Sequence, residues 1–392
     1  MGAQSEARRH AVAVVYPFFA HYRGPVNRAL MESRAHHYLF VGDTKDRRGA
    51  GIKVWECQDP TRFIQTRCHY IADRYVIQSG LTRLALRRDI GTIIYLGDAQ
   101  YLTTWLSAAI ARLTGKRVLF WTQGWVHRDS GIKNRLRISF YRLAHGLLLY
   151  GRAAKMVGIA KNFRPENLHV VYNSLDYDSQ KAVRAQITEG RIQEIRAELF
   201  PRQHLPMLIC VGRLVPVRQL DLLFQALRRL KQEDFETNLL IVGDGPERPR
   251  LQGIAEQSGL SVRFYGACYD EAVLAGLIMA SNVMVFPGSI GLAAMHALAY
   301  GTAVITHDDQ ESQMPEWEAI VPGRNGDVFR AGDSGDLARV IRDWAGRRLP
   351  SAQERAERYE VIERFYNPRF QCQVIERAVA GMPADDEFWR GE

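Results

Sequence analysis

The sequence predicts an α/β protein made of two doubly wound domains, each with a parallel sheet between helices. Short runs of β-branched apolar residues alternate along the chain with segments of helical periodicity, which is the pattern of consecutive βαβ units. Eleven such runs are too many for one sheet of ordinary size. A length of 392 residues also suits two or three domains.

Six strands are expected in the first half of the chain and five in the second. Their apolar runs are continuous, as in strands that are buried on both faces. The expected strands are 11–16, 37–42, 92–97, 117–122, 147–150 and 169–172, then 207–212, 238–243, 262–266, 283–287 and 303–306. Apolar residues at i, i+3 and i+4 predict helices between most of them, for example over 219–231 and 271–280.

A turn-like stretch at 173–179 and a polar, charged stretch after it separate the two halves. Four parts of the chain follow from this break. We expect a first domain over 1–180, a linker region over 181–205, a second domain over 206–365, and a C-terminal helix and tail over 366–392 that packs back towards the first domain.

The net charge of +9 is unevenly distributed, because 1–180 is strongly basic and 181–392 mildly acidic. The basic residues include four in an expected helix near 132–145, namely Lys133, Arg135, Arg137 and Arg142. On one face of that helix Leu136, Phe140 and Leu143 would meet the core or lipid. Such a surface suits a phosphorylated substrate, an anionic membrane or simple solvation. Nucleic acid is disfavoured because no recognised binding motif is present.

Cysteine usage and hydropathy exclude other classes. Five scattered cysteines without a CxxC pair exclude a disulfide scaffold and a zinc ribbon, and they favour the cytosol. No apolar run reaches the ~20 residues of a spanning helix. Neither GxGxxG nor GxxxxGK[ST] occurs. Ligands of open parallel sheets bind beyond the carboxyl ends of the strands, so the expected active site is the cleft between two such domains.

An ordered series of motifs occupies the second half. The series consists of VGRLVPVRQLDLL (211–223), LLIVGDGPERPRL (239–251), VRFYGACYDE (262–271), SNVMVFPGSIGLAAMHALAYGTAVIT (281–306) and MPEWEAIVPGRNGDVF (314–329). It resembles the GT-B-fold retaining glycosyltransferases of family 4, of the bacterial polysaccharide-assembly type. In the first half, YPFFAHYRGPVNRAL (16–30), WTQGW (121–125) and VVYNSLD (170–176) are similar to segments of the same family.

The resemblance implies a GT-B fold, with two Rossmann-like domains facing across a cleft. It also implies a hexosyltransferase-like enzyme that moves a sugar from a nucleotide-diphosphate sugar to a saccharide or lipid-linked acceptor in polysaccharide or surface-glycan biosynthesis. The C-terminal domain would bind the donor and the basic N-terminal domain the acceptor. Such an enzyme would be cytoplasmic and peripheral at the inner face of the membrane. A non-catalytic GT-B subunit or scaffold and a sugar-nucleotide epimerase remain as alternatives.

Arg213 and Arg218 are the expected catalytic residues. Arg213 directly follows a strand end and Arg218 lies five residues on, so two fixed cations could neutralise a diphosphate leaving group. The resembled family usually has lysine at the second position, and Arg218 offers a fork instead of a point charge. The alternative is a pair of surface arginines, one of them paired with Asp221.

A glycine-containing turn before an expected helix is the candidate diphosphate site, because helix N-terminal N–H groups bind anions. The donor-binding residues expected here are Gly288, Ser289, Ile290, Gly291 and Leu292, together with Gly266, Ala267 and His296. In the resembled family two glutamates occupy the positions of Gly288 and His296, and they contact the donor sugar and the ribose. His296 could bind ribose hydroxyls through its ring nitrogens or be an ordinary core histidine.

The acceptor side is expected at His21, Tyr22, Arg23 and Gly24 in the first βα loop, and at Gln123 after a later strand. Simple loop packing is the alternative. The resembled family often has a histidine where this chain has Gln123, which is no base near neutral pH. Retention there is thought to proceed by front-face displacement, in which the departing phosphate takes the acceptor proton. No metal site is evident in the sequence, so we expect neither a metal nor another cofactor.

Overall fold

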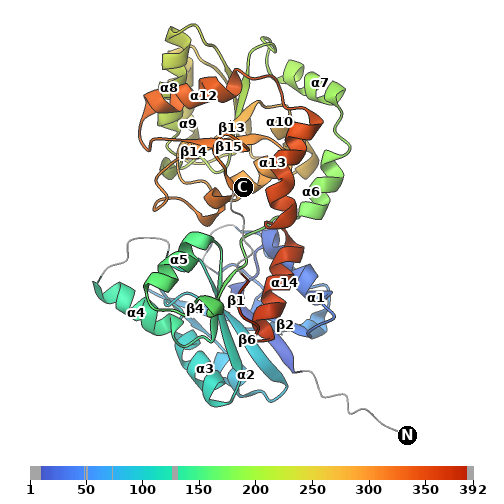
Figure 1. Ribbon diagram of the computed structural model, residues 1–392, viewed down its shortest axis with the longest axis vertical. Coiled ribbons are helices and arrows are strands. Elements are labelled where there is room, and N and C mark those ends of the chain that lie inside the picture. Colours follow the sequence, from blue (N-terminus) through green and yellow to red (C-terminus); the bar gives the residue numbers. More distant parts are fainter. Residues whose placement is uncertain (1–9, 48, 50–51, 73, 126–130, 386–392) are drawn as a thin grey trace. The chain divides into compact units, whose positions relative to one another are not determined.

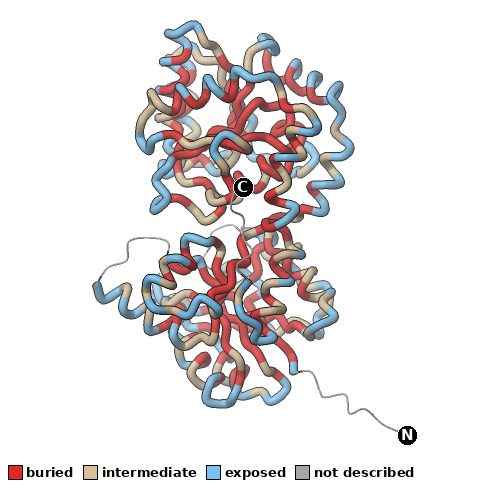
Figure 2. Tube along the Cα trace, viewed as in Figure 1, coloured by how far each residue is buried: buried red, intermediate tan, exposed pale blue. Residues whose placement is uncertain are grey.

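The computed structural model describes residues 10–385 apart from 48, 50–51, 73 and 126–130 (Figure 1). The described residues divide into two compact units. The first unit contains the residues up to Leu175 and those from Asn367 onward, and the second contains Asp176–Tyr366. Each unit is a parallel sheet between two layers of helices, with the buried strands inside and exposed helix faces outside (Figure 2).

The first unit holds a seven-stranded parallel sheet in the order β3-β2-β1-β6-β7-β8-β9. Its strands are β1 (Ala11–Phe18), β2 (Tyr38–Asp43), β3 (Phe63–Gln65), β6 (Ile90–Leu96), β7 (Arg117–Thr122), β8 (Gly146–Leu149) and β9 (Leu168–Val170). An antiparallel ribbon joins β4 (Cys68–Ile71) to β5 (Tyr75–Gln78). The helices are α1 (Gly24–Met31), α2 (Leu81–Leu86), α3 (Leu102–Leu113), α4 (Gly131–Tyr141), α5 (Arg152–Ala160) and α14 (Pro368–Val379).

Successive residues of β1 enter two different apolar clusters, which is why its sequence is apolar throughout. Ala13 and Val15 pack into the cluster on one face of the sheet, and Val12 and Val14 into the cluster on the other. The last helix, α14, closes the second cluster, where it contributes four side chains from the far end of the chain: Cys372, Ile375, Ala378 and Val379. Figure 1 shows α14 beside α1.

The second unit holds a six-stranded parallel sheet in the order β12-β11-β10-β13-β14-β15. Its strands are β10 (Met207–Val211), β11 (Asn238–Val242), β12 (Ser261–Gly266), β13 (Val283–Val285), β14 (Ala303–His307) and β15 (Gly326–Phe329). Its helices are α6 (Tyr177–Arg184), α7 (Glu189–Leu199), α8 (Leu220–Gln232), α9 (Arg248–Ser258), α10 (Glu271–Met279), α11 (Leu292–Ala299), α12 (Ser334–Ala345) and α13 (Ala352–Arg364).

The eleven expected strands are all present, with ends shifted by a few residues. The expected linker over 181–205 is different, because it contains the end of α6 and all of α7, and both helices belong to the second unit. Despite its many charged residues, α7 is an amphipathic helix whose Ile192, Ile195 and Leu199 are buried. Its Arg196 donates from Nη1 to the Ala280 carbonyl over 2.8 Å. The units divide after Leu175 and Tyr366 instead. No helix within the described ranges is long and apolar enough to cross a membrane.

Candidate functional site

The second sheet changes its direction of winding between β10 and β13. From β10 the chain adds β11 and β12 on one side, and β13, β14 and β15 lie on the other. Open α/β sheets bind ligands at such a point, beyond the carboxyl ends of the strands. The loop after β10 carries Arg213 and Arg218, and the loop after β13 carries the glycine turn at 288–291. The structure therefore places both predicted groups at the same edge of one sheet.

The two arginines differ in their surroundings. Arg213 is exposed and has no hydrogen-bond or ion-pair partner among the described residues, so its charge is available to a ligand. Arg218 is half-buried over the ring of Phe286, with Cζ 5.0 Å from the ring centroid. Its Nη1 donates to the Ser289 carbonyl over 2.7 Å, and its buried Nε has no partner within the described part of the chain. Burial lowers the pKa of Arg218.

The sequence left open that one of the two arginines is a surface residue paired with Asp221, but neither arginine pairs with it. Arg250 of α9 holds that carboxylate with both Nη groups, at 2.6 and 2.8 Å. Arg218 instead ties the short 3₁₀ turn Pro216–Arg218 to the glycine turn after β13. Arg218 thus supplies a positive charge at this edge of the sheet and also holds the two loops together.

Gly288 lies where the backbone allows no side chain. A Cβ atom at this position would come within 2.1 Å of the Val217 carbonyl oxygen and 2.9 Å of Arg218 Cα. The loops after β10 and β13 therefore meet backbone against backbone. Gly288 cannot be replaced here by a glutamate, the residue that the resembled family has at this position, without moving one of the loops.

A buried glutamine that no sequence pattern indicated holds the glycine turn in place. Gln313 accepts a hydrogen bond from the Ile290 N–H over 2.8 Å, and its amide donates to Thr306 Oγ1 and the His307 carbonyl. The Ile290 N–H is consequently engaged, whereas the first turn of α11 has no side-chain cap. Leu292 and the residues after it present that uncapped turn. No spacing in the sequence could have identified Gln313, because it lies in an irregular loop.

His296 belongs to a polar cluster formed by three helices. Its Nδ1 lies 3.2 Å from Gln180 Nε2 of α6 and 3.4 Å from Glu271 Oε1 of α10. The same carboxylate accepts hydrogen bonds from Gln180 and from the Tyr300 hydroxyl. Burial alone would raise the pKa of Glu271, but the hydrogen bond and charge of His296 and the other two donors lower it to about 2.

His296 is therefore neither a bare surface residue nor a fully enclosed one, since 21% of its side chain is exposed. Glu271 was not predicted as a site residue, although its position at the start of a helix after a strand was a usable signal. Gly266 ends β12 shortly before Glu271 in the sequence, and Ala267 after it is exposed. The Gly266 carbonyl accepts a hydrogen bond from the Gly243 N–H over 2.7 Å. These residues line the carboxyl edge of the second sheet.

In the first unit, the predicted acceptor residues follow β1 and β7. His21 and Tyr22 are at the surface, and His21 Nδ1 lies 3.3 Å from the Lys53 carbonyl. Arg23 is buried, with only 8% of the residue exposed. Gly24 starts α1 against Trp55, and a Cβ atom there would touch its ring at 3.0 Å. Gln123 is exposed at the carboxyl end of β7.

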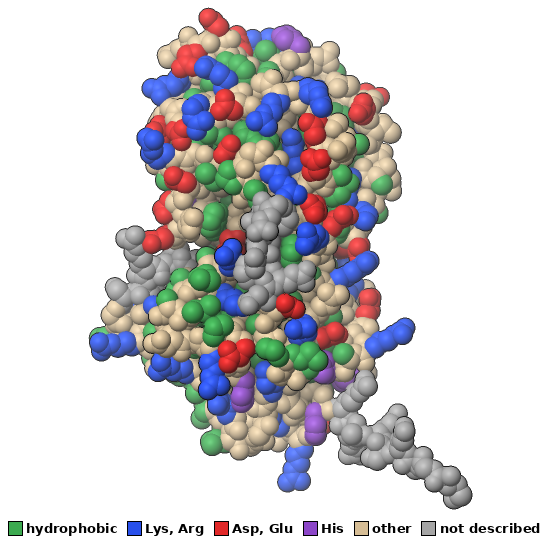
Figure 3. Space-filling model, viewed as in Figure 1, with side chains coloured by type: hydrophobic (Ala, Val, Ile, Leu, Met, Phe, Trp, Pro, Cys, Tyr) green, Lys and Arg blue, Asp and Glu red, His purple; other side chains and the backbone are tan. Residues whose placement is uncertain are grey.

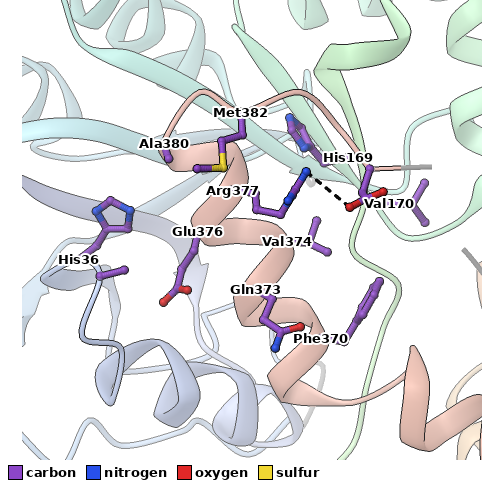
Figure 4. Close-up of a pocket in the computed structure, with 12 residues that line it drawn as sticks. His36, His169, Val170, Phe370, Gln373, Val374, Glu376, Arg377, Ala380 and Met382 are labelled. Atoms are coloured by element: carbon purple, nitrogen blue, oxygen red, sulfur yellow. Dashed lines mark ion pairs between the residues drawn. The ribbon is translucent and has the colours of Figure 1, made fainter. Parts of the chain in front are cut away.

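A cavity of about 490 Å³ lies elsewhere in the first unit, along α14 (Figure 4). Its lining includes His36, His169 and Arg377, and none of the predicted site residues. Arg377 pairs with Asp385 at 3.5 Å. The His169 Nε2 atom is buried without a partner among the described residues, and burial lowers the pKa of that imidazole to about 4. The ring is thus neutral near pH 7.

Acidic groups do not assemble into a metal site. Among the residues that the structure describes, no three His, Cys, Asp or Glu side chains are arranged to hold an ion. Asp176 and Asp178 lie at the start of α6, where the Asp176 carboxylate accepts a hydrogen bond from the Ser179 N–H.

Comparison with known proteins identifies the second unit. Residues 191–360 match the family model "Glycosyl transferases group 1". The second unit carries a glycosyl transferases group 1 domain. The chain is 35% identical over 102 residues to a GDP-mannose-dependent alpha-(1-6)-phosphatidylinositol dimannoside mannosyltransferase of Mycobacterium tuberculosis, over 25% of this chain and 26% of that protein. It is 32% identical over 164 residues to a D-inositol 3-phosphate glycosyltransferase of Streptomyces avermitilis, over 38% and 34% of the two chains. The chain thus spans about a quarter to a third of these curated relatives.

The likeness to solved structures covers both units and not only the group 1 domain. The lipopolysaccharide outer core galactosyltransferase WaaB aligns at a TM-score of 0.66 and 16% identity, over 95% of this chain and 99% of that chain. Anabaena HepE, solved in complex with UDP, aligns at 0.69 and 15% identity, over 95% and 100%. Likeness at these identities shows the fold, and it confirms the predicted fold class, GT-B with two Rossmann-like domains.

Proposed function

We propose that this chain is a retaining glycosyltransferase of family 4. It would transfer a sugar from a nucleotide-diphosphate sugar to a saccharide or lipid-linked acceptor in polysaccharide or surface-glycan biosynthesis. The observation that carries the proposal is the edge of the second sheet, where Arg213, Arg218 and the uncapped start of α11 surround the winding switch between β10 and β13. The names of the relatives, which include nucleotide-sugar-dependent transferases, support it.

The arginines would act on the leaving group. As the bond from the sugar C1 to the diphosphate breaks, negative charge grows on the phosphate oxygen, and two fixed cations stabilise that charge. The acceptor hydroxyl forms its bond to C1 on the same face, and its proton passes to the departing phosphate oxygen. No protein base is required by this step, which agrees with an exposed Gln123 and no histidine at that position. We propose that the two guanidinium groups do this without a metal cofactor.

The first test is kinetic and uses the two arginines. Arg213→Ala should lower kcat far more than it raises the donor KM, by about two to three orders of magnitude (~3–4 kcal/mol), because the contact strengthens only in the transition state. Arg218→Ala should show the same kinetic loss, and Arg218→Lys should recover much of it. Transfer should persist in excess EDTA, and the product should keep the anomeric configuration of the donor.

The stability of these variants separates the two roles of the arginines. Arg213→Ala should leave Tm unchanged, whereas Arg218→Ala should lower it, because it loses the bond to the Ser289 carbonyl. Arg250→Ala, which breaks only the surface pairs with Asp221 and Glu247, is the matched control and should transfer sugar at the wild-type rate. Undiminished transfer in the Arg213→Ala, Arg218→Ala double variant would refute the site. A wild-type protein that binds no nucleotide sugar would point to the scaffold alternative, and interconversion of sugar nucleotides without an acceptor to the epimerase.

We also propose that the first unit docks on an anionic membrane at the cytoplasmic face. In α4, Phe140 and the nearby Leu143 face the core as expected, but Leu136 is 53% and Ile132 82% exposed. Exposed Lys133 and Arg135 lie beside them. On the face of the first unit drawn in Figure 3, Lys and Arg side chains lie among hydrophobic ones. Apolar side chains among basic ones are typical of surfaces that bind anionic lipid.

A further inference from the structure

The first unit buries an arginine inside a cage of aromatic rings. The Arg23 Cζ lies 4.4 Å from the ring centroid of Tyr16, 4.3 Å from that of Trp121 and 5.7 Å from that of Tyr150. Its Nη2 donates to the Tyr150 hydroxyl. We call these four side chains the Arg23 cage.

The cage contains a charge without a counter-ion. Arg23 is 8% exposed, and no carboxylate among the described residues pairs with it. Burial alone would lower its pKa, but the Tyr150 and Tyr16 hydroxyls beside it raise it, so the guanidinium stays charged. Buried charges in proteins are ordinarily paired with an opposite charge. An anion bound beside Arg23 would therefore stabilise this buried charge.

The cage also has spare hydrogen-bond donors. A guanidinium has five N–H groups, and the Tyr150 hydroxyl takes one of them. The Trp121 indole N–H is buried without a partner among the described residues. Donors of this kind suit a ligand group with several acceptor oxygens and a negative charge, and the guanidinium fork suits phosphate in particular.

The position of the cage is that of a ligand site. Tyr16 lies near the carboxyl end of β1, Trp121 near that of β7, and Tyr150 directly follows β8. The first sheet changes its direction of winding beside β1, since β2 and β3 lie on one side of it and β6 to β9 on the other. Ligands of open parallel sheets bind at this point.

We infer that the Arg23 cage is a binding site for a phosphate group of a substrate. Naming the substrate rests on the proposed function, in which a phosphate comes either from a lipid-linked acceptor or from the donor diphosphate. The binding itself does not require that function, because inorganic phosphate can be titrated without turnover.

The test titrates inorganic phosphate, with acetate as a comparison, into the full-length Arg213→Ala, Arg218→Ala protein, which removes the proposed donor cations of the second unit. Saturable binding is followed by calorimetry and by the rise in Tm. Binding should fall at least about tenfold in Arg23→Met and be weakened in Arg23→Lys, which keeps the charge but not the fork. Arg88→Ala removes an exposed arginine of the first unit that belongs to no proposed site, and it is the matched control, with unchanged binding expected.

Stability tells an anion site from a purely structural arginine. Arg23→Met should leave the phosphate-free Tm unchanged or raise it, because it removes an unpaired buried charge, while the phosphate-dependent rise disappears. Should that variant fail to fold, Tyr16→Phe keeps the ring and removes only the hydroxyl beside Arg23, and it should weaken phosphate binding. No saturable phosphate binding, or equal binding by wild-type and cage variants, would overturn the inference. So would tighter binding of acetate than of phosphate.

Kinetics then identifies the source of the phosphate. If Arg23→Lys raises the acceptor KM alone, the cage holds the acceptor phosphate, and if it raises the donor KM alone, it holds the donor diphosphate. The two proposals also fail separately. If phosphate binds to the cage but the protein transfers no sugar, the anion site is supported and the proposed function is refuted. If sugar transfer and phosphate binding are both unchanged in the cage variants, the proposed function stands and the anion site is refuted.

Discussion

At the scale of single residues, Glu271 connects the polar cluster of the second unit to pH. Its pKa is about 2 in the folded chain against an ordinary value of 4.5, so the unfolded chain binds more protons between these values. Stability from this group is therefore complete above about pH 4.5 and is lost as pH falls towards 2. In urea unfolding from pH 2.5 to 7, Glu271→Gln should flatten this part of the profile.

A second variant tests whether the acid sensitivity comes from the Glu271 carboxylate. Tyr300→Phe removes one donor to the Glu271 carboxylate and leaves the His296 and Gln180 contacts, so the acid-dependent loss should shrink without vanishing. A Glu271→Gln protein with the wild-type profile would show that other carboxylates cause the acid sensitivity.

Gly288 offers a prediction about backbone contact. Gly288→Ala should destabilise the protein by about 1–3 kcal/mol or more, because the new methyl group would lie 2.1 Å from the Val217 carbonyl. Gly253→Ala is the matched control, since its Cβ in the middle of α9 meets nothing within 4 Å and alanine favours helices by up to about 1 kcal/mol. Opposite shifts in Tm are expected, and equal ones would contradict this account of the loops.

At the scale of elements, α4 should bind anionic membranes. Each basic residue near such a surface contributes about 1 kcal/mol, screened by salt. Replacing Lys133, Arg135, Arg137 and Arg142 with Glu should therefore weaken binding to vesicles that contain anionic lipid, as measured by sedimentation. Four reversals on the second unit, at the exposed Arg228, Arg330, Arg347 and Arg348, form the control. Binding to neutral vesicles of equal strength would exclude this electrostatic mechanism.

Elements were also what the sequence predicted best. Every continuous apolar run became a strand, because a strand covered on both faces needs apolar residues at every position. The missed strands are short or edge pieces, such as β15 and the β4-β5 ribbon, whose burial alternates or is incomplete. In the site, Arg213 and the turn at 288–291 followed from their place after strands. Gln313 and the cage around Arg23 did not, since their partners are distant in sequence and only the fold joins them.

At the scale of the whole molecule, the first unit depends on residues from both ends of the chain. Ile375 of α14 is fully buried in its second cluster, so Ile375→Ala should cost about 2–5 kcal/mol. Hydrogen exchange should show the loss of protection in the first unit and leave the second unit unchanged. The exposed Gln373→Ser on the same helix is the control. Equal loss in both units would mean that they unfold as one.

The same discontinuity sets an order of events during synthesis. The strands of the first unit are synthesised before the second unit, but the helix that closes one face of their sheet is synthesised after it. The second unit is translated in between, which takes roughly ten to forty seconds at about 5–20 residues per second. Its chain is continuous, so it has all its parts before α14 emerges. The unit whose strands are made first is therefore completed only after the second unit, and until then the apolar face that α14 covers stays open.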